Sequence, residues 1–139
     1  MAIEISRYCI PWTPFRKQLE EATVMLVSTA AVHHKDAPPF IIDGDLSWRA
    51  IDGATPVADL RVADGHYDHA CVDVDINSVF PLDRLHELAQ KDRRIAAVAE
   101  KHFTTGFTAD LRRFRDETVP AVMNEVVKQR PDAVILTGG

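Results

Sequence analysis

The apolar positions of the chain define two runs that have the pattern of buried strands. Residues 23–32 (TVMLVSTAAV) are almost continuously apolar, include β-branched residues and show no alternation with polar positions. This pattern is typical of a central parallel strand that is covered on both faces. A second apolar run, residues 133–136, stands between Pro131 and residues 137–139 (TGG). We therefore predict a second buried parallel strand there, followed by a tight turn.

Two other segments have the spacing of amphipathic helices. Pro81 is well placed in the first turn of a helix that we expect to run to about Lys91. The apolar face of this helix would consist of Leu82, Leu85, Leu88 and Ala89. A further helix is predicted after Thr108, which can cap it, with Asp110 in its first turn. Pro120 should kink or split that helix.

The remaining segments predict shorter elements. Residues 35–64 contain several prolines and glycines, so we expect a largely irregular excursion. Within it, residues 59–62 favour a short strand, and residues 47–49 could pair in an edge hairpin. Residues 95–99 have the pattern of a buried strand or a short apolar helix and should lead to a turn at Gly106.

The order of these elements predicts the fold class. Strand, helix-containing crossover, strand, helix and strand is the order of an α/β protein with an open, mostly parallel sheet and flanking helices, as in one half of a Rossmann- or flavodoxin-like fold. The last predicted strand has no following segment to cover its flank, so the sheet looks incomplete at the C-terminus. We expect residues 1–139 to be a single α/β domain or the N-terminal half of one. Residues 1–20, with two prolines and three aromatic residues, favour an extended arm.

Composition and charge narrow the function classes. Apolar residues make up 46% of the 139 residues and charged residues 27%, which is typical of a folded domain. A net charge of −5 argues against a nucleic-acid partner, since phosphate binding needs clustered cations. The sequence has no apolar run of about 18 residues and no signal-peptide pattern, so we expect a cytoplasmic protein without a membrane span. Cys9 and Cys71 are expected to be free thiols.

The most concentrated candidate chemistry lies in His66-Tyr67-Asp68-His69. This sequence is similar to the H-x-H-x-D-H zinc motif of metallo-β-lactamase-type hydrolases, although Asp64 stands in place of the first histidine. One hypothesis is therefore a small metal-dependent hydrolase that uses His66, Asp68 and His69 as ligands. The alternative is a surface loop in which His and Asp side chains satisfy one another and the nearby backbone.

Two further segments could contribute to a site at the carboxyl ends of the strands, where α/β proteins bind their ligands. His33 follows the first strand and could act as a general acid or base, because the ordinary pKa of histidine lies near neutrality. Residues 102–106 (HFTTG) could form another loop at the same edge, or simply a turn before the last helix. The sequence contains neither a glycine-rich phosphate loop nor a G-x-S-x-G nucleophile elbow.

Several stretches, taken together and in order, resemble the selenoprotein B family, the B subunits of glycine, sarcosine and betaine reductases and of D-proline reductase. The stretches are residues 11–14 (PWTP), 27–33 (VSTAAVH), 35–40 (KDAPPF), 44–49 (GDLSWR), 65–68 (GHYD) and 75–85 (DINSVFPLDRL). None is specific alone, but the set covers nearly the whole chain. The resemblance implies an oxidoreductase that cleaves a C–N bond of an amino-acid-type substrate reductively.

The resemblance also implies where the reactive groups lie. A pyruvoyl group on a partner subunit would activate the substrate, and a selenocysteine or cysteine is expected just after Gly139, following the segment 131–137. The chain would then be an N-terminal fragment or a product cut at an in-frame UGA codon, inactive alone, with no cofactor of its own. The groups expected to line the substrate site are Thr29, His33, His66, Asp68, His69 and Asn77. A third hypothesis is a non-catalytic binding or assembly module, and the uncovered sheet favours a homo-oligomer.

Overall fold

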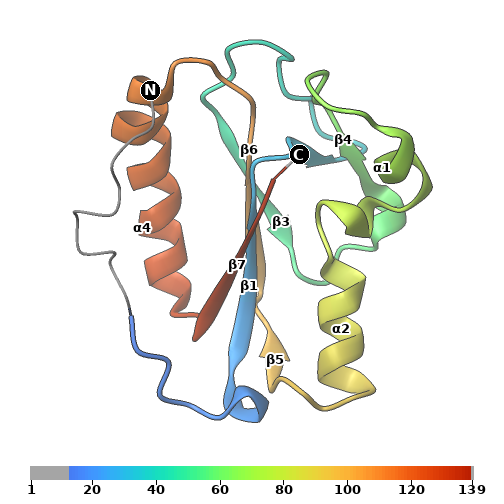
Figure 1. The fold of residues 1–139 in the computed structure, drawn as a ribbon, viewed down its shortest axis with the longest axis vertical. Helices are drawn as coiled ribbons and strands as arrows, with labels where there is room; N and C mark the ends of the chain where they lie inside the picture. Colours follow the sequence, from blue (N-terminus) through green and yellow to red (C-terminus); the bar gives the residue numbers. More distant parts are fainter. Residues whose placement is uncertain (1–12, 139) are drawn as a thin grey trace.

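Strand β1 (Thr23–Ser28) is the centre of a five-stranded sheet in the computed structural model, which describes residues 13–138 (Figure 1). β7 (Ala133–Thr137) pairs with it in parallel on one side. On the other side β1 pairs in parallel with β5 (Ala97–Val98) at its beginning and with β6 (Lys101–Thr105) at its end. β3 (Trp48–Asp52) adds an antiparallel strand beyond β6. The sheet is thus open and mostly parallel, which confirms the predicted fold class.

The long apolar run 23–32 does not form one strand, which corrects the prediction. β1 stops at Ser28, and β2 (Val32–His34) belongs to a separate two-stranded antiparallel sheet with β4 (Leu60–Val62). The turn between them has local causes: the Ser28 hydroxyl accepts a hydrogen bond from the Ala30 amide, and Ala31 adopts a left-handed φ of 51°. β4 confirms the short strand expected within residues 59–62.

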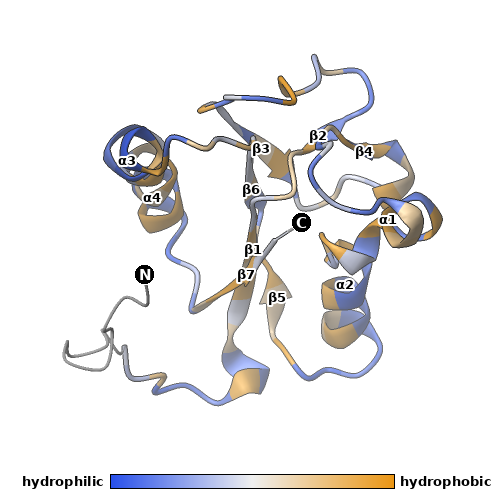
Figure 2. Cartoon of the chain, turned by 45° about the horizontal axis from the view of Figure 1, so that its top comes forward, coloured by the Kyte–Doolittle hydropathy of each residue, from blue (hydrophilic) through white to orange (hydrophobic). Residues whose placement is uncertain are grey.

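Two helices cover opposite faces of the main sheet (Figures 1 and 2). α2 (Leu82–Gln90) confirms the helix predicted after Pro81. α4 (Val119–Gln129) covers the other face and has Pro120 in its first turn, where proline is tolerated. It is preceded by α3 (Leu111–Arg113) and a π-helical segment (Phe114–Thr118), so the predicted second helix is divided just before Pro120.

The described residues contain few other helical elements. They are α1 (Ala70–Val74) and the short 3-10 turns Leu19–Glu21, Val57–Asp59 and Ile76–Ser78. The cap of α3 differs from the expectation, because the Asp110 carboxylate rather than Thr108 accepts the bond from the Arg113 amide. In the part of the chain that the structure describes, no helix combines the length and apolar character needed to cross a membrane.

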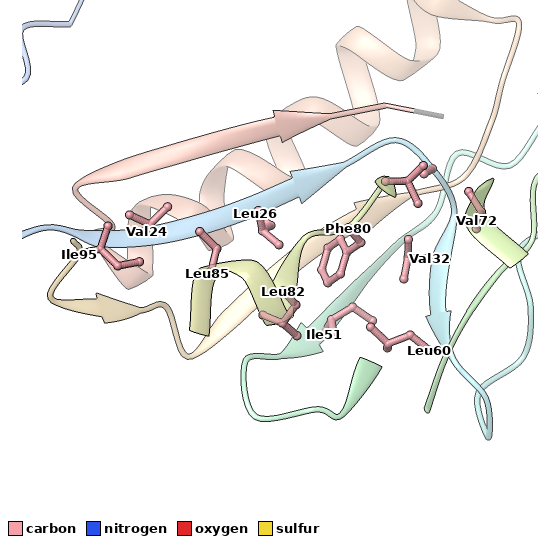
Figure 3. Packing of buried hydrophobic residues seen from close by; sticks show 12 residues of the cluster. Val24, Leu26, Val32, Ile51, Leu60, Val72, Phe80, Leu82, Leu85 and Ile95 are labelled. Atoms are coloured by element: carbon pink, nitrogen blue, oxygen red, sulfur yellow. The ribbon is translucent and has the colours of Figure 1, made fainter. Parts of the chain in front are cut away.

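The core has two parts, one on each face of the sheet. The larger contains Val24 and Leu26 of β1 with Leu82 and Leu85 of α2, and Phe80 lies at its centre (Figure 3). The smaller contains Met25 and Phe103 with Val122 and Val126 of α4. Neighbouring residues of β1 therefore point to opposite layers, as expected for a strand covered on both faces.

Three sequence predictions about the other strands need correction. Residues 47–49 do not form a local hairpin, because β3 pairs with the distant β6 at the edge of the sheet. Residues 101–105, expected to include a loop, form β6, whose residues 102–105 are all buried. Residues 95–99 contain only the short β5.

β7 is parallel as predicted, but it is not buried. Within the described residues it pairs with β1 alone, and Val134, Ile135 and Leu136 are 38%, 40% and 76% exposed. The prediction treated a continuous apolar run as evidence of cover on both faces, whereas this strand lies at the edge of the sheet. The predicted arm lies largely outside the described residues, and of its later part Lys17 pairs with Asp132 at 2.7 Å, just before β7.

Candidate functional site

A cavity of about 370 Å³ opens beside the carboxyl ends of β1 and β6, where the fold class predicts a ligand site. Three loops contribute to it: Thr29 follows β1, Gly106 follows β6, and residues 64–67 follow β4. The segment around α3 closes one wall with apolar side chains. The complete lining is Thr29, Asp64, His66, Tyr67, Gly106, Phe107, Thr108, Leu111 and Phe114.

His66 is the best-anchored polar group of this cavity. Its Nδ1 atom lies 2.9 Å from the Asp64 carboxylate, and its Nε2 atom lies 2.9 Å from the Asp43 carboxylate. The same Asp64 oxygen also accepts the backbone amide of His66 at 2.8 Å. A carboxylate can only accept hydrogen bonds, so both contacts are satisfied when both ring nitrogens donate, which is the case in the protonated imidazolium form of the ring. The hydrogen bond to Asp64, and secondarily the one to Asp43, raises the pKa of His66 above its ordinary value.

Phe107 and Asp45 fix the surroundings of this imidazolium. The Phe107 ring stacks on His66 with 3.7 Å between the ring centroids. Asp45 is buried, its carboxylate accepts hydrogen bonds from Ile41 and Ser47, and its amide donates to the Phe107 carbonyl at 2.8 Å. Burial raises the pKa of Asp45, but the hydrogen bonds outweigh it and hold the pKa below its ordinary value. The loop before β3 is thereby attached to the loop after β6.

Replacing Asp64 by Asn should lower the pKa of His66, because the hydrogen bond that the His66 ring donates to the Asp64 carboxylate is the main cause that raises it. The measurement is an NMR pH titration of the His66 imidazole. Asp68→Asn is the matched control, since Asp68 lies in the same loop but its carboxylate bonds the Ala70 amide instead. An unchanged His66 titration in the Asp64 variant would contradict the hydrogen-bonded arrangement.

Tyr67 and His69 lie side by side next to this group. Their ring centroids are 4.7 Å apart, and Tyr67 lines the cavity while also packing against the larger core. The Tyr67 hydroxyl and the His69 Nε2 atom are both buried, and neither has a hydrogen-bond partner among residues 13–138. Burial, with smaller effects from Asp64 and Asp73, raises the pKa of Tyr67, so this hydroxyl stays protonated at neutral pH. Both rings therefore offer unused polar atoms beside the cavity.

Thr29 connects the cavity to the end of β7. It is exposed at the end of β1, and its amide donates to the Thr137 carbonyl at 3.0 Å. A Cβ atom placed on Gly138 would lie 3.5 Å from the Thr29 hydroxyl. The hydroxyls of Ser28 and Thr137 both donate to the Val79 carbonyl, which ties the ends of β1 and β7 to the turn before α2. The backbone beyond β7 is thus held against the cavity wall.

The other predicted site residues do not line this cavity. His33 is buried in β2, where its Nδ1 atom contacts the His34 carbonyl. Asp68 is exposed at the start of α1. Asn77 bonds Asp75 and Asp83 in the turn before α2. The structure therefore brings Thr29 and His66 together, with His69 adjacent through Tyr67, and a substrate role for all six residues stays a prediction.

The metal hypothesis finds no ligand group in the structure. Among residues 13–138, no cluster of three or more His, Cys, Asp or Glu side chains is arranged to hold a metal ion. Both ring nitrogens of His66 already face carboxylates, and the Asp68 carboxylate bonds the Ala70 amide. Cys71 is exposed and forms no disulfide within the described residues, whereas Cys9, also predicted to be a free thiol, lies outside them.

Sequence reasoning missed two important members of the site, Asp43 and Phe107. Asp43 lies 23 residues before His66 in a segment that carries no motif, so no local signal identifies it. Phe107 directly follows the segment 102–106, for which the sequence predicts either a site loop or a turn. An aromatic residue just after a strand at this edge was the signal that could have found it.

Comparison with known proteins identifies the family of the chain. The family described as glycine/sarcosine/betaine reductase selenoprotein B matches residues 7–139. D-proline reductase subunit gamma of Acetoanaerobium sticklandii is 40% identical over 129 residues, which are 92% of this chain and 53% of the relative. The chain thus spans about half the length of this curated relative, and no solved structure gives a significant match. The chain belongs to the glycine/sarcosine/betaine reductase selenoprotein B family.

Proposed function

We propose that this chain supplies the N-terminal portion of a reductase subunit that cleaves a C–N bond of an amino-acid-type substrate. Family membership supports the reaction class, and the cavity at the carboxyl ends of β1 and β6 supports the location. The observation that carries the proposal is the position of Thr29, which lines the cavity and also holds the end of β7 through the Thr137 carbonyl. A residue that follows β7 would emerge beside this cavity.

The resemblance to the family implies that a selenocysteine or cysteine follows β7. A selenolate or thiolate there would attack the substrate carbon, and the electron pair of the C–N bond would leave with the amine. A pyruvoyl group on a partner subunit would supply the activation of the substrate. The groups of this chain that line the cavity, among them Thr29, His66 and Tyr67, would bind and orient the substrate.

Association with other subunits is part of the same proposal. The curated relative is named as one subunit of D-proline reductase, which favours partner subunits for this chain as well. The exposed side chains of Val134, Ile135 and Leu136 on β7 support association, because apolar side chains on an edge strand favour cover by another segment. A homo-oligomer and a pyruvoyl-containing partner are both compatible with such a surface.

The test is alanine replacement of His66 in the full-length active protein. His66→Ala should lower kcat/KM at least about tenfold, as expected for loss of one positioned polar group. Its half-exposed ring is not part of the core, so the thermal midpoint should stay close to that of the unmodified protein. His69→Ala should also lower turnover, because its ring packs beside Tyr67 in the cavity wall.

His34→Ala is the matched control, because this half-exposed histidine of β2 does not line the cavity and should leave turnover unchanged. Unchanged turnover of the His66 variant would remove this residue from the site. A parallel loss in the His34 variant would show that the effect is not specific to the cavity.

A further inference from the structure

We infer that the Nε2 atom of His66 is a binding point for a ligand carboxylate. In the free chain the Asp43 carboxylate occupies this point, and a ligand would replace it. The two carboxylates that contact the imidazolium are not equivalent. The side chain of Asp64 is 5% exposed, whereas that of Asp43 is 84% exposed. One is a buried anchor and the other a surface group.

A ligand cannot easily replace Asp64 as the hydrogen-bond partner of His66. One Asp64 oxygen accepts both the Nδ1 atom and the backbone amide of His66, which fixes the ring relative to its own main chain. Phe107 stacks on the ring at 3.7 Å and fixes its plane. The Nε2–H bond of His66 therefore points in a set direction whether or not Asp43 is present. Such a pre-oriented, charged donor is suited to bind an anion.

The Asp43 side is built differently. Within residues 13–138, the Asp43 carboxylate makes no hydrogen bond or ion pair other than the one to His66. Its neighbours Ile41, Ile42 and Gly44 are exposed, and Gly44 has a φ of 80°. An exposed ion pair of this kind contributes little free energy, so a competing carboxylate can replace Asp43 without disturbing the core.

The place of this donor identifies the ligand chemistry. His66 lines the cavity together with Asp64 and Phe107, so a carboxylate at Nε2 would place the rest of a small molecule at the cavity rim. The charged groups that contact the imidazolium are Asp64 and Asp43, and Phe107 covers one ring face without charge. The assignment of this binding point to the carboxylate of an amino-acid-type substrate rests on the proposed function.

Acetate is the probe for this site, because it offers a carboxylate and nothing else that the cavity could recognise. The 139-residue chain is titrated with sodium acetate while the His66 imidazole is followed by NMR, at a pH where His66 is protonated in every variant. Sodium chloride at the same ionic strength is the control for screening. We expect a saturable shift of the His66 signals with acetate and none with chloride.

Asp43→Asn removes the negative charge that competes with acetate while keeping the shape of the side chain. The variant should bind acetate roughly twofold to fivefold more tightly than the unmodified chain, which corresponds to release of one exposed ion pair. Asp92→Asn, at another exposed aspartate, one that forms no ion pair within residues 13–138, should bind acetate like the unmodified chain. Acetate affinity should also fall as the pH rises through the pKa of His66.

Three results would overturn the inference: equal acetate affinity with and without the Asp43 carboxylate, the same shift with chloride as with acetate, or no saturable shift while His66 is protonated. None of these measurements uses turnover. Failure of the reductase function would therefore leave an acetate result standing, and failure of the acetate site would leave the proposed reaction to be judged by the His66→Ala experiment.

Discussion

Lowering the pH from 7 to 5 should lower the free energy of unfolding by about 2 kcal/mol through His102 alone, and by about 3 kcal/mol at pH 4. His102 lies in β6 and is completely buried. Burial, with a smaller contribution from His86, lowers its pKa from 6.5 to about 4. The unfolded chain therefore binds a proton near pH 6.5 that the folded protein takes up only near pH 4. Stability is full above pH 6.5 and falls as the pH drops toward 4.

The hydrogen bonding of His102 explains why its ring does not readily bind a second proton in the folded protein. Its Nδ1 atom accepts the Leu26 amide of β1 at 2.8 Å, so the single ring proton is on Nε2. Within the described residues Nε2 is buried without a partner, and the ring packs edge-on against Phe80. Protonation of Nδ1 would place two donors face to face and leave a charge in an apolar layer.

The comparison that isolates this effect is His102→Asn, measured by denaturant unfolding at both pH values. The Asn side-chain oxygen can still accept the Leu26 amide but does not titrate, so the variant should lack about 2 kcal/mol of the pH dependence between pH 7 and 5. His34→Asn, at a half-exposed position, controls for the loss of a histidine. Equal pH dependence in the unmodified protein and the His102 variant would contradict a buried neutral ring.

Local sequence patterns predicted the elements that have the usual composition and spacing of their type. β1 and α2 have the composition and spacing of buried strand and amphipathic helix; α2 forms where expected, and β1 begins where expected but ends early, at Ser28. The failures arise from contacts that are distant in sequence. Residues 101–105 look too polar for an inner strand, yet β6 forms between β1 and β3 because His102 and Thr104 turn their polar atoms to β1 and β2 amides. A pattern of residue types cannot show such pairings.

The same distinction between local sequence and distant contacts applies to the candidate site. His66 stands out in the sequence because histidine and carboxylates crowd around it, and the structure places it in the cavity wall. The partners that define its chemistry come from other parts of the chain: Asp43 from the loop before β3 and Phe107 from the loop after β6. Asp45 joins these loops through the Phe107 carbonyl. The sequence could therefore identify the histidine and the nearby Asp64, but not Asp43 or Phe107, which reach the ring from distant loops.

Phe80 lies in the turn before α2, where this turn meets the larger core. It is fully buried, its amide donates to the Ile76 carbonyl, and its ring centroid lies 6.0 Å from that of His102 (Figure 3 shows the ring among its neighbours). The preceding residue, Val79, supplies the carbonyl that holds the hydroxyls of Ser28 and Thr137. Packing of this one ring thus supports both α2 and the strand ends beside the cavity.

Replacing Phe80 by Ala should lower the free energy of unfolding by about 3–5 kcal/mol, because a fully buried ring is lost and the larger core is left with a cavity. Denaturant unfolding at neutral pH measures the loss as a lower midpoint at an unchanged slope. Phe15→Ala is the matched control: this ring is 48% exposed, and its removal should cost less than about 1 kcal/mol. Equal losses at the two positions would contradict the placement of Phe80 at the centre of the core. A large loss at Phe80 alone would show that the larger core depends on this ring.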